Sequence, residues 1–312
     1  MFTEAIVYQG IDVAKDSLEC NGTALIGEVK NEVRGVRRAL EKWKREHPGL
    51  HIVCEPSGGY ERVLVSVAHA LKIPISLVNA RQVRDFARSI GRLEKTDKVD
   101  AQVLRLYGEK IQPKTTEPIS PQLHALQEWV QTRDYYVEQQ RAETNRLEQI
   151  DVPELQKVIR AQLRHLGALL EKIEKRIDAF IQEQAPELEV KVQTLCLVQG
   201  VGTLTAISLI AHLPELGELS GPAITKLAGL APICSDSGTW RGRRSIRHGR
   251  SAARRALFLA ALVAARWNDH LRPVYQRLRA AGKPPKVALI AVARKLLLFL
   301  NKLLSLPPTL PS

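Results

Sequence analysis

Short apolar runs alternate with amphipathic stretches over the first hundred residues of the chain. Runs rich in β-branched residues occupy positions 5–13 and 51–55, and each ends at or beside an acidic residue. The stretches between them have the spacing of helices. Strands separated by helices in this way are typical of an α/β sheet. The sequence therefore predicts an α/β domain over residues 1–112, which opens with a hairpin whose turn is the Asn21-Gly22 pair.

The chain between residues 119 and 187 is polar and is predicted to be helical, after a linker at 113–118. Its second helix carries an apolar seam at alternating steps of three and four, formed by Leu163, Leu166, Leu170, Ile173 and Ile177. This spacing is that of a coiled coil. Either a helical hairpin within one molecule or a partner chain would bury the seam. We favour the partner chain, because two long helices here have little else to pack against, and expect a homo-oligomer, either a dimer or a tetramer.

A third segment, residues 190–305, is predicted to be mainly helical apart from a basic loop at 232–250. Near its start, Gly200 and Gly202 separate two apolar helices in the string LVQGVGTLTA. Two helices joined by a Gly-x-Gly turn look like a helix-hairpin-helix motif, whose backbone amides are available for DNA phosphates. A plain turn between helices is the alternative interpretation.

The composition indicates a polyanionic partner. The 312 residues include 46 Lys and Arg against 33 Asp and Glu, a formal charge of +13. This excess favours DNA or RNA, with a membrane surface as the rival partner. Aromatic residues make up 5%, which argues against single-strand binding by base stacking. We expect no membrane span or signal peptide, and four cysteines far apart indicate neither a zinc site nor a disulfide framework, so a reducing cytoplasm is the simplest location.

Four acidic residues contrast with this basic balance. Asp12 and Glu55 stand at predicted strand ends, and Asp97 and Asp100 lie three residues apart in a predicted helix, on one face of it. Clustered carboxylates repel one another unless a cation lies among them, and hard oxygen ligands suit Mg²⁺ or Mn²⁺. We therefore predict that these four residues form a catalytic metal site. The alternative for each one is a solvated or helix-capping acid.

The basic loop is the second candidate site. It holds arginines suited to bidentate phosphate contacts, at Arg241, Arg243, Arg244, Arg247 and Arg250. Ser237 lies at the front of the loop, followed by Gly238. A serine beside several guanidinium groups is suited to attack a phosphodiester, because the arginines neutralise the charge that develops. From chemistry alone, however, most Ser-Gly pairs are turns.

Four strings of the chain resemble one known family. They are GIDVAKDSL, CEPSGGYERVL, VNARQVRDFARSIGRLEKTDKVDAQVL, and GLAP followed by SGTWRGRRSIRHGR. In this order they resemble the insertion-sequence one-ten family, transposases related to Piv-type DNA invertases, over nearly the whole chain. The resemblance implies an N-terminal RuvC-like domain of the RNase H fold, whose metal-binding acids would be Asp12, Glu55, Asp97 and Asp100.

The same resemblance implies a C-terminal transposase domain whose serine nucleophile would be Ser237, and a coiled coil that supports assembly. Family members cut and rejoin donor and target DNA through a covalent phosphoserine, and use a structured non-coding RNA to specify both. The implied location is the prokaryotic cytoplasm, at the nucleoid.

The sequence supports one leading hypothesis for the function of the chain and leaves two alternatives open. In the first, the chain is a DNA recombinase in which Ser237 attacks a phosphodiester, assisted by Mg²⁺ on the acid quartet. In the second, it is a RuvC-like nuclease that uses metal-activated water, with the C-terminal segment as a DNA clamp. In the third, it is a non-catalytic scaffold that binds nucleic acid through its arginines.

Overall fold

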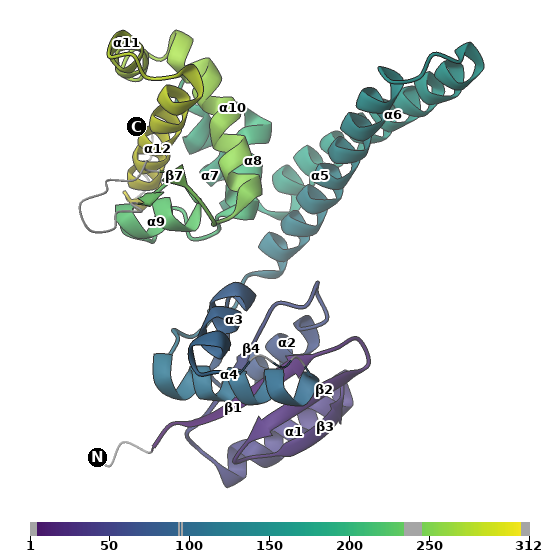
Figure 1. Ribbon diagram of the computed structural model, residues 1–312, viewed down its shortest axis with the longest axis vertical. Helices are drawn as coiled ribbons and strands as arrows, with labels where there is room; N and C mark the ends of the chain where they lie inside the picture. Colours follow the sequence, from purple (N-terminus) through teal and green to yellow (C-terminus); the bar gives the residue numbers. More distant parts are fainter. Residues whose placement is uncertain (1–4, 93, 95, 234–244, 307–312) are drawn as a thin grey trace. The chain divides into compact units, whose positions relative to one another are not determined.

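The computed structural model describes residues 5–92, 94, 96–233 and 245–306 (Figure 1). The chain divides into two compact units, Met1–Pro118 and Ile119–Ser312, each with its own hydrophobic core. Within the described ranges, none of the helices combines the length and the apolar character that a membrane span needs.

A five-stranded mixed sheet forms the centre of the N-terminal unit. Its strand order is β3-β2-β1-β4-β5. The first three strands form an antiparallel meander, made of β1 (Val7–Val13), β2 (Ser17–Gly22) and β3 (Ile26–Lys30). The other two lie parallel to β1, as β4 (Leu50–Cys54) and β5 (Ile75–Leu77). The predicted α/β class of this part of the chain is therefore confirmed.

Two helices cover each face of this sheet (Figure 1). They are α1 (Val33–Glu46) and α2 (Arg62–Ala70) on one face, and α3 (Ala80–Ser89) and α4 (Asp97–Ile111) on the other. Successive strand residues point to alternate faces. Ile11 and Ile52 accordingly pack with α1 and α2, whereas Tyr8 and Val53 pack with α3 and α4.

The predicted hairpin corresponds to β2 and β3, and it differs from the prediction in its turn. Asn21 and Gly22 lie inside β2, and the chain reverses at residues 23–25. A Cβ on Gly22 would overlap the side chain of Gln9, whose Nε2 donates to Leu25 O at 2.8 Å. The glycine at this position therefore serves close packing against Gln9, and the predicted Asn-Gly turn is wrong.

The predicted linker at 113–118 belongs to the N-terminal unit. Thr116 N–H donates to Ile75 O at 2.7 Å, and Leu77 N–H donates to Thr116 Oγ1 at 2.9 Å. β5 ends the sheet on this side, so the segment covers an edge strand whose backbone groups would otherwise be unpaired.

A long helical hairpin, α5 (Pro121–Leu147) and α6 (Pro153–Gln184), begins the second unit (Figure 1). The predicted seam on α6 is half-buried at Leu163 and buried at Leu166, Leu170, Ile173 and Ile177. Because α6 packs along α5 of the same chain, one molecule is sufficient to bury this seam. The hairpin interpretation accounts for it, and assembly into an oligomer stays a prediction.

The remainder of the second unit is mainly helical, as predicted. Its helices are α7 (Pro186–Cys196), α8 (Thr203–His212), α9 (Gly221–Leu227), α10 (Ser251–Trp267), α11 (Arg272–Ala280) and α12 (Pro285–Ser305). A small antiparallel pair, β6 (Pro232–Ile233) with β7 (Ser245–Ile246), lies within the predicted basic loop and was not expected there. Short two-residue strands leave no periodic pattern in the sequence.

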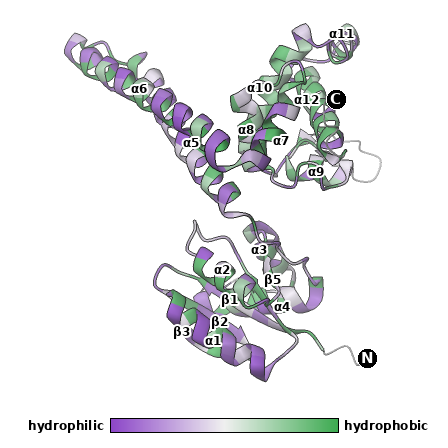
Figure 2. Cartoon of the chain, turned by 180° about the vertical axis from the view of Figure 1, so that it is seen from behind, coloured by the Kyte–Doolittle hydropathy of each residue, from purple (hydrophilic) through white to green (hydrophobic). Residues whose placement is uncertain are grey.

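The base of the helical hairpin and the C-terminal helices share one hydrophobic core. Leu126 of α5 and Ile177 of α6 belong to the same buried cluster as Leu257 of α10 and Leu296 of α12. Figure 2 shows the apolar residues concentrated on α8, α10 and α12, whereas the hairpin is mostly hydrophilic. The hairpin base is thus anchored in the C-terminal helices.

Candidate active site

The two strand-end acids reach adjacent positions. Asp12 follows Ile11 in β1, and Glu55 follows Cys54 at the end of β4. Ile11 and Cys54 are register partners of this parallel pair. By strand alternation both acids fall on the face of the sheet that α3 and α4 cover. Both are half-buried, so the predicted proximity of these strand ends is present in the backbone.

α4 runs antiparallel along β1 in close backbone contact. A Cβ on Gly10 would overlap the backbone of Ala101 and Arg105, and a Cβ on Gly108 would overlap the ring of Tyr8. Moving two residues back along β1, from Gly10 to Tyr8, therefore corresponds to moving forward by somewhat more than one turn along α4, to Gly108. Only glycine permits this spacing at both positions.

Moving two residues forward along β1 from Gly10 leads to Asp12. The corresponding move back along α4, again by somewhat more than one turn, leads to its first turn, which holds Asp97 and Asp100. Thr96 caps this turn with its side chain. Asp97 is exposed, and Asp100 is half-buried with its Oδ1 3.7 Å from Arg84 Nη1. The backbone thus brings the four predicted acids toward one region, at the carboxyl ends of β1 and β4.

The side chains of these acids are not arranged with the geometry of a metal-binding site. Among the described residues, which include all four acids, no three His, Cys, Asp or Glu side chains are grouped so that they could hold an ion. Carboxylate oxygens are the donors that a hard divalent cation prefers. Donor chemistry and backbone placement therefore fit a metal, whereas the side chains are not arranged as a coordination shell, and metal binding stays a prediction.

Asn31 joins the loops that follow the two strand-end acids. Its Nδ2 donates to Ala14 O at 2.9 Å, two residues after Asp12, and to Tyr60 O at 3.0 Å, in the loop after Glu55. One side chain from the end of β3 therefore fixes the separation of the two loops. We assign Asn31 a positioning role.

Glu61 folds the loop after Glu55 onto itself. Its Oε2 accepts hydrogen bonds from Ser57 N at 2.8 Å, Gly59 N at 2.9 Å and Ser57 Oγ at 3.2 Å. Partial burial alone would raise the pKa of this carboxyl group. The hydrogen bonds favour its ionised form more strongly and hold its pKa below the ordinary value of 4.5. The Glu61 carboxylate is therefore part of what shapes the Glu55 loop.

Glu61→Gln is expected to lower the free energy of unfolding by about 1 kcal/mol at neutral pH, because charge-assisted hydrogen bonds at a partly exposed group are lost. A lowered folded-state pKa means that the ionised carboxylate stabilises the fold above pH 4.5 and that this contribution disappears as the pH falls through the folded-state pKa. Urea unfolding at pH 7 and at about pH 3 should therefore show a smaller difference between variant and parent at the lower pH.

The matched control is Glu41→Gln, which removes an exposed carboxylate paired with Arg37 along α1. It should change stability by less than about 0.5 kcal/mol. A difference between Glu61→Gln and the parent that is the same at both pH values would show that the ionised carboxylate does not hold the loop.

Ser237, Arg241, Arg243 and Arg244 lie outside the described residues. The structure does describe how the chain enters and leaves the segment 234–244 that carries them. Ile233 of β6 and Ser245 of β7 are register partners. The two ends of the segment with the predicted nucleophile therefore meet at this small sheet.

Two glycines form a tight crossing beneath β6 and β7. Gly229 precedes β6 and Gly249 follows β7, with left-handed φ angles of 68° and 71°. A Cβ on Gly249 would overlap the backbone N and Cα of Gly229, and Arg250 N–H donates to Leu227 O at 2.8 Å. The chain segments that lead into and out of the Ser237 segment therefore touch backbone to backbone.

Gly249→Ala is expected to destabilise the C-terminal unit by about 3 kcal/mol. The left-handed backbone contributes about 1–2 kcal/mol, and overlap with Gly229 contributes a similar amount. Thermal unfolding measures the loss. The control is Gly282→Ala, because Gly282 has a φ of 75° but nothing lies within 4 Å of a Cβ placed there. Equal losses in the two variants would mean that the crossing itself contributes no stability.

The two described arginines of the predicted phosphate-binding set differ in their surroundings. Arg250 is engaged by the protein, since its terminal nitrogens lie 2.6 and 2.7 Å from the carboxylate oxygens of Glu215 and Nη1 also donates to His212 O at 3.0 Å. Arg250 therefore has a structural role in this fold, and its phosphate contact stays a prediction. Arg247 is exposed, and no residue in the described ranges forms an ion pair with it, so its side chain is available to an external phosphate.

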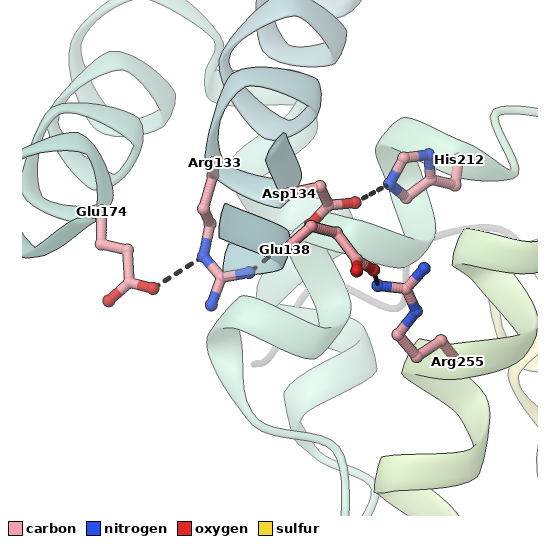
Figure 3. Close-up of polar contacts among 6 residues, drawn as sticks. All are labelled: Arg133, Asp134, Glu138, Glu174, His212 and Arg255. Atoms are coloured by element: carbon pink, nitrogen blue, oxygen red, sulfur yellow. Dashed lines mark hydrogen bonds and ion pairs between the residues drawn. The ribbon is translucent and has the colours of Figure 1, made fainter. Parts of the chain in front are cut away.

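A polar network connects the helical hairpin to this region (Figure 3). Its members are Arg133, Asp134 and Glu138 of α5, Glu174 of α6, His212 of α8 and Arg255 of α10. Arg133 Nε donates to Glu174 Oε1 at 2.7 Å, and Asp134 Oδ2 lies 2.9 Å from His212 Nε2. Glu138 pairs with Arg255. The hairpin is thereby fixed to α8 and to the first turns of α10, which follow the glycine crossing.

The Gly-x-Gly turn separates α7 from α8 as predicted. Gly200 has a φ of 107°, and a Cβ there would lie 2.9 Å from Ala264 Cβ on α10, so this glycine serves packing. Gly202 is exposed at the N-cap of α8, with open space around a Cβ placed on it. Only the Gly202 side of the turn therefore presents its backbone to solvent, and phosphate binding there stays a prediction.

Sequence reasoning missed Asn31 and Glu61, whereas a close backbone approach with positive φ at Gly249 is an expectation of the sequence that the structure confirms. Glu61 has a signal, because an acid that follows a Gly-Gly turn can accept from its amides. Asn31 has none, since it bonds to Tyr60, which is 29 residues away along the chain.

Two family models match the chain. A transposase model of the IS110 type matches residues 9–150, and a model described as the transposase IS116/IS110/IS902 family matches residues 192–276. The first range contains all four predicted acids, and the second contains the segment that carries Ser237. The two matches thus cover both candidate sites.

Three individual proteins are also similar. The pilin gene-inverting proteins of Moraxella lacunata and Moraxella bovis are each 27% identical to this chain over 305 residues, which is 93% of each chain. The insertion element IS110 uncharacterized 43.6 kDa protein of Streptomyces coelicolor is 31% identical over 127 residues, 37% of this chain and 31% of that protein. The similarity to the Moraxella proteins therefore extends across both units.

Proposed function

The chain belongs to the IS110 family of transposases, and from this premise we propose that it is a DNA recombinase that cuts and rejoins DNA through a covalent phosphoserine at Ser237. The position of the two family matches carries the proposal, because one spans the acid-bearing unit and the other spans both flanks of the serine-bearing segment. The Moraxella relatives are named for inverting a gene, a change that also requires DNA to be cut and rejoined.

In the proposed reaction Ser237 Oγ attacks the phosphorus of a phosphodiester. A bond forms between Oγ and phosphorus while the bond from phosphorus to one deoxyribose oxygen breaks. The serine proton passes to solvent, and the departing sugar oxygen takes up a proton. Attack by the hydroxyl of another strand end then reverses these changes and releases the serine. Each step replaces one phosphoester bond with another, so rejoining needs no external energy source.

The surrounding residues would position and neutralise the reacting phosphate. Arg247, which is exposed beside the segment, is suited to bidentate contact with phosphate oxygens, as are Arg241, Arg243 and Arg244 in the segment itself. Asp12, Glu55, Asp97 and Asp100 would hold Mg²⁺ or Mn²⁺, which when bound supplies positive charge to a phosphate oxygen. Asn31 and Glu61 would keep the Asp12 and Glu55 loops at their separation.

The same proposal includes the fold of the N-terminal domain, a contact with the DNA backbone, an oligomer and a guide RNA. The three-strand meander followed by two parallel strands supports a RuvC-like N-terminal domain of the RNase H fold. The exposed Gly202 end of the α7–α8 turn supports helix-hairpin-helix contact with a DNA backbone. The α5–α6 hairpin would act as the coiled coil of a dimer or tetramer. A structured RNA would specify the donor and target DNA.

The test of the proposal is a covalent protein–DNA adduct. The chain is incubated with labelled duplex DNA that flanks its coding sequence, in the presence of Mg²⁺ and of any RNA that co-purifies with it. Denaturing electrophoresis should then show labelled DNA that migrates with the protein and is released by protease. Cleaved DNA with free ends and no adduct would instead support a nuclease that uses water as its nucleophile.

A further inference from the structure

The positive charge of this chain is concentrated in its last quarter. Residues 237–312 contain 16 of the 46 Lys and Arg residues and one of the 33 Asp and Glu residues, Asp269. This segment alone therefore carries a formal charge of +15, whereas the residues before it together carry −2. The excess that favours a polyanionic partner thus belongs to Ser237 and the helices that follow it.

Ion pairs neutralise part of this charge inside the protein. They are Arg250–Glu215, Arg255–Glu138 and Arg272–Asp269. At the corner between α11 and α12, by contrast, Arg277, Lys283 and Lys286 are exposed, and within the described part of the chain no carboxylate pairs with them. We call these three residues the corner cations.

The backbone of this corner is fixed by its own hydrogen bonds. α11 ends in a Schellman motif, in which the N–H groups of Gly282 and Lys283 donate back to carbonyls of its last turn, both at 3.0 Å, and Gly282 has a φ of 75°. The Arg279 side chain donates to Lys283 O. Pro284 and Pro285 then begin α12. The backbone that carries the corner cations therefore needs little further ordering when a ligand binds.

The corner lies away from β6 and β7, the strands that flank the Ser237 segment, along the same unit (Figure 1). β7 and the glycine crossing precede α10, and α11 follows it. In Figure 1, α9 and β7 lie at one end of the C-terminal helices and α11 lies at the other. α10 has 17 residues and is thus about 25 Å long. This length corresponds to about seven base pairs of duplex DNA at 3.4 Å each.

We propose that the corner cations form a second phosphate-binding surface, which contacts the backbone of the duplex that Ser237 attacks, on the order of seven base pairs from the stretch of duplex nearest β7. The inference rests on the proposed recombinase function. Exposed cations without neighbouring carboxylates suit a phosphate backbone, because binding releases its condensed counterions. Contacts of this kind position a duplex without reading its sequence. DNA is the favoured occupant because the charge lies in the segment that carries the nucleophile.

The test is a triple variant of the full chain, Arg277→Gln, Lys283→Gln and Lys286→Gln. Its affinity for a fluorescent duplex of arbitrary sequence is measured by anisotropy over a range of salt concentrations. Each lost phosphate contact should make the slope of log affinity against log salt shallower by about 0.9, so the triple variant should be shallower by about 2–3. Affinity near 0.1 M salt should fall at least about tenfold.

The matched control removes the same charge from α1, through Arg37→Gln, Lys42→Gln and Arg45→Gln, which are exposed in the N-terminal unit. It should leave the slope nearly unchanged. Duplex binding by the corner variant that equals the control would overturn the proposal. So would weakening confined to a structured RNA, or confined to vesicles of acidic phospholipid. Absence of any adduct in the parent chain would instead contradict the recombinase function, which the slope does not measure.

Discussion

Ser237→Ala is expected to abolish the covalent protein–DNA adduct. The reaction depends on an oxygen nucleophile at position 237, and alanine offers none, so the rate of adduct formation should fall on the order of 10⁴-fold or more. DNA binding should remain, because the arginines of the loop and the corner cations are unchanged. The measurement is the yield of protease-sensitive labelled product, taken under conditions where anisotropy shows the DNA to be fully bound.

Two comparisons make this result specific. Ser251→Ala removes an exposed hydroxyl at the start of α10 and should leave the adduct yield unchanged. Ser237→Cys retains a nucleophilic atom and should give a lower yield of a thiol-linked adduct. If Ser237→Ala still cleaves DNA and leaves free ends at the parental rate, the attacking group is water, and the nuclease alternative is correct.

Sequence reasoning reaches the acid quartet because its evidence is local. A β-branched run that ends in an acid marks Asp12 and Glu55, and helical spacing puts Asp97 and Asp100 on one face. What brings the four residues together is not local. α4 can lie against β1 only because Gly10 and Gly108 lack side chains at the contacts, and a lone glycine within a strand or helix does not reveal its partner.

In the basic loop the sequence identifies the residues but not their structural roles. Composition finds its arginines but cannot separate those that the fold uses from those it leaves exposed. Arg250 pairs with Glu215, which is 35 residues away and outside the loop, whereas Arg247 is three residues before it and exposed. The same limit applies to Gly200, whose glycine requirement comes from Ala264 of a distant helix. Tertiary partners, and not residue types, decide these roles.

The position of Asp12 allows metal dependence and DNA binding to be separated. Asp12→Asn keeps the size of the side chain and removes one negative charge at the end of β1. Loss of one carboxylate ligand should reduce adduct formation by several kcal/mol of activation free energy, on the order of 10³-fold. Affinity for duplex DNA should stay the same or rise slightly, because a charge that repels phosphate is gone. Removal of divalent ions from the parent with a chelator should reproduce the loss.

Asp16→Asn provides the matched control, since Asp16 is an exposed acid four residues further along the same segment. It should leave both adduct yield and metal dependence as in the parent. Adduct formation that survives both Asp12→Asn and chelation would mean that the arginines alone neutralise the reacting phosphate. The acid quartet would then be structural, consistent with side chains that are not arranged as a coordination shell among the described residues. If Asp12→Asn abolishes adduct formation but chelation has no effect, the conclusion is the same. Asp12 would then be needed for the fold at the carboxyl ends of β1 and β4.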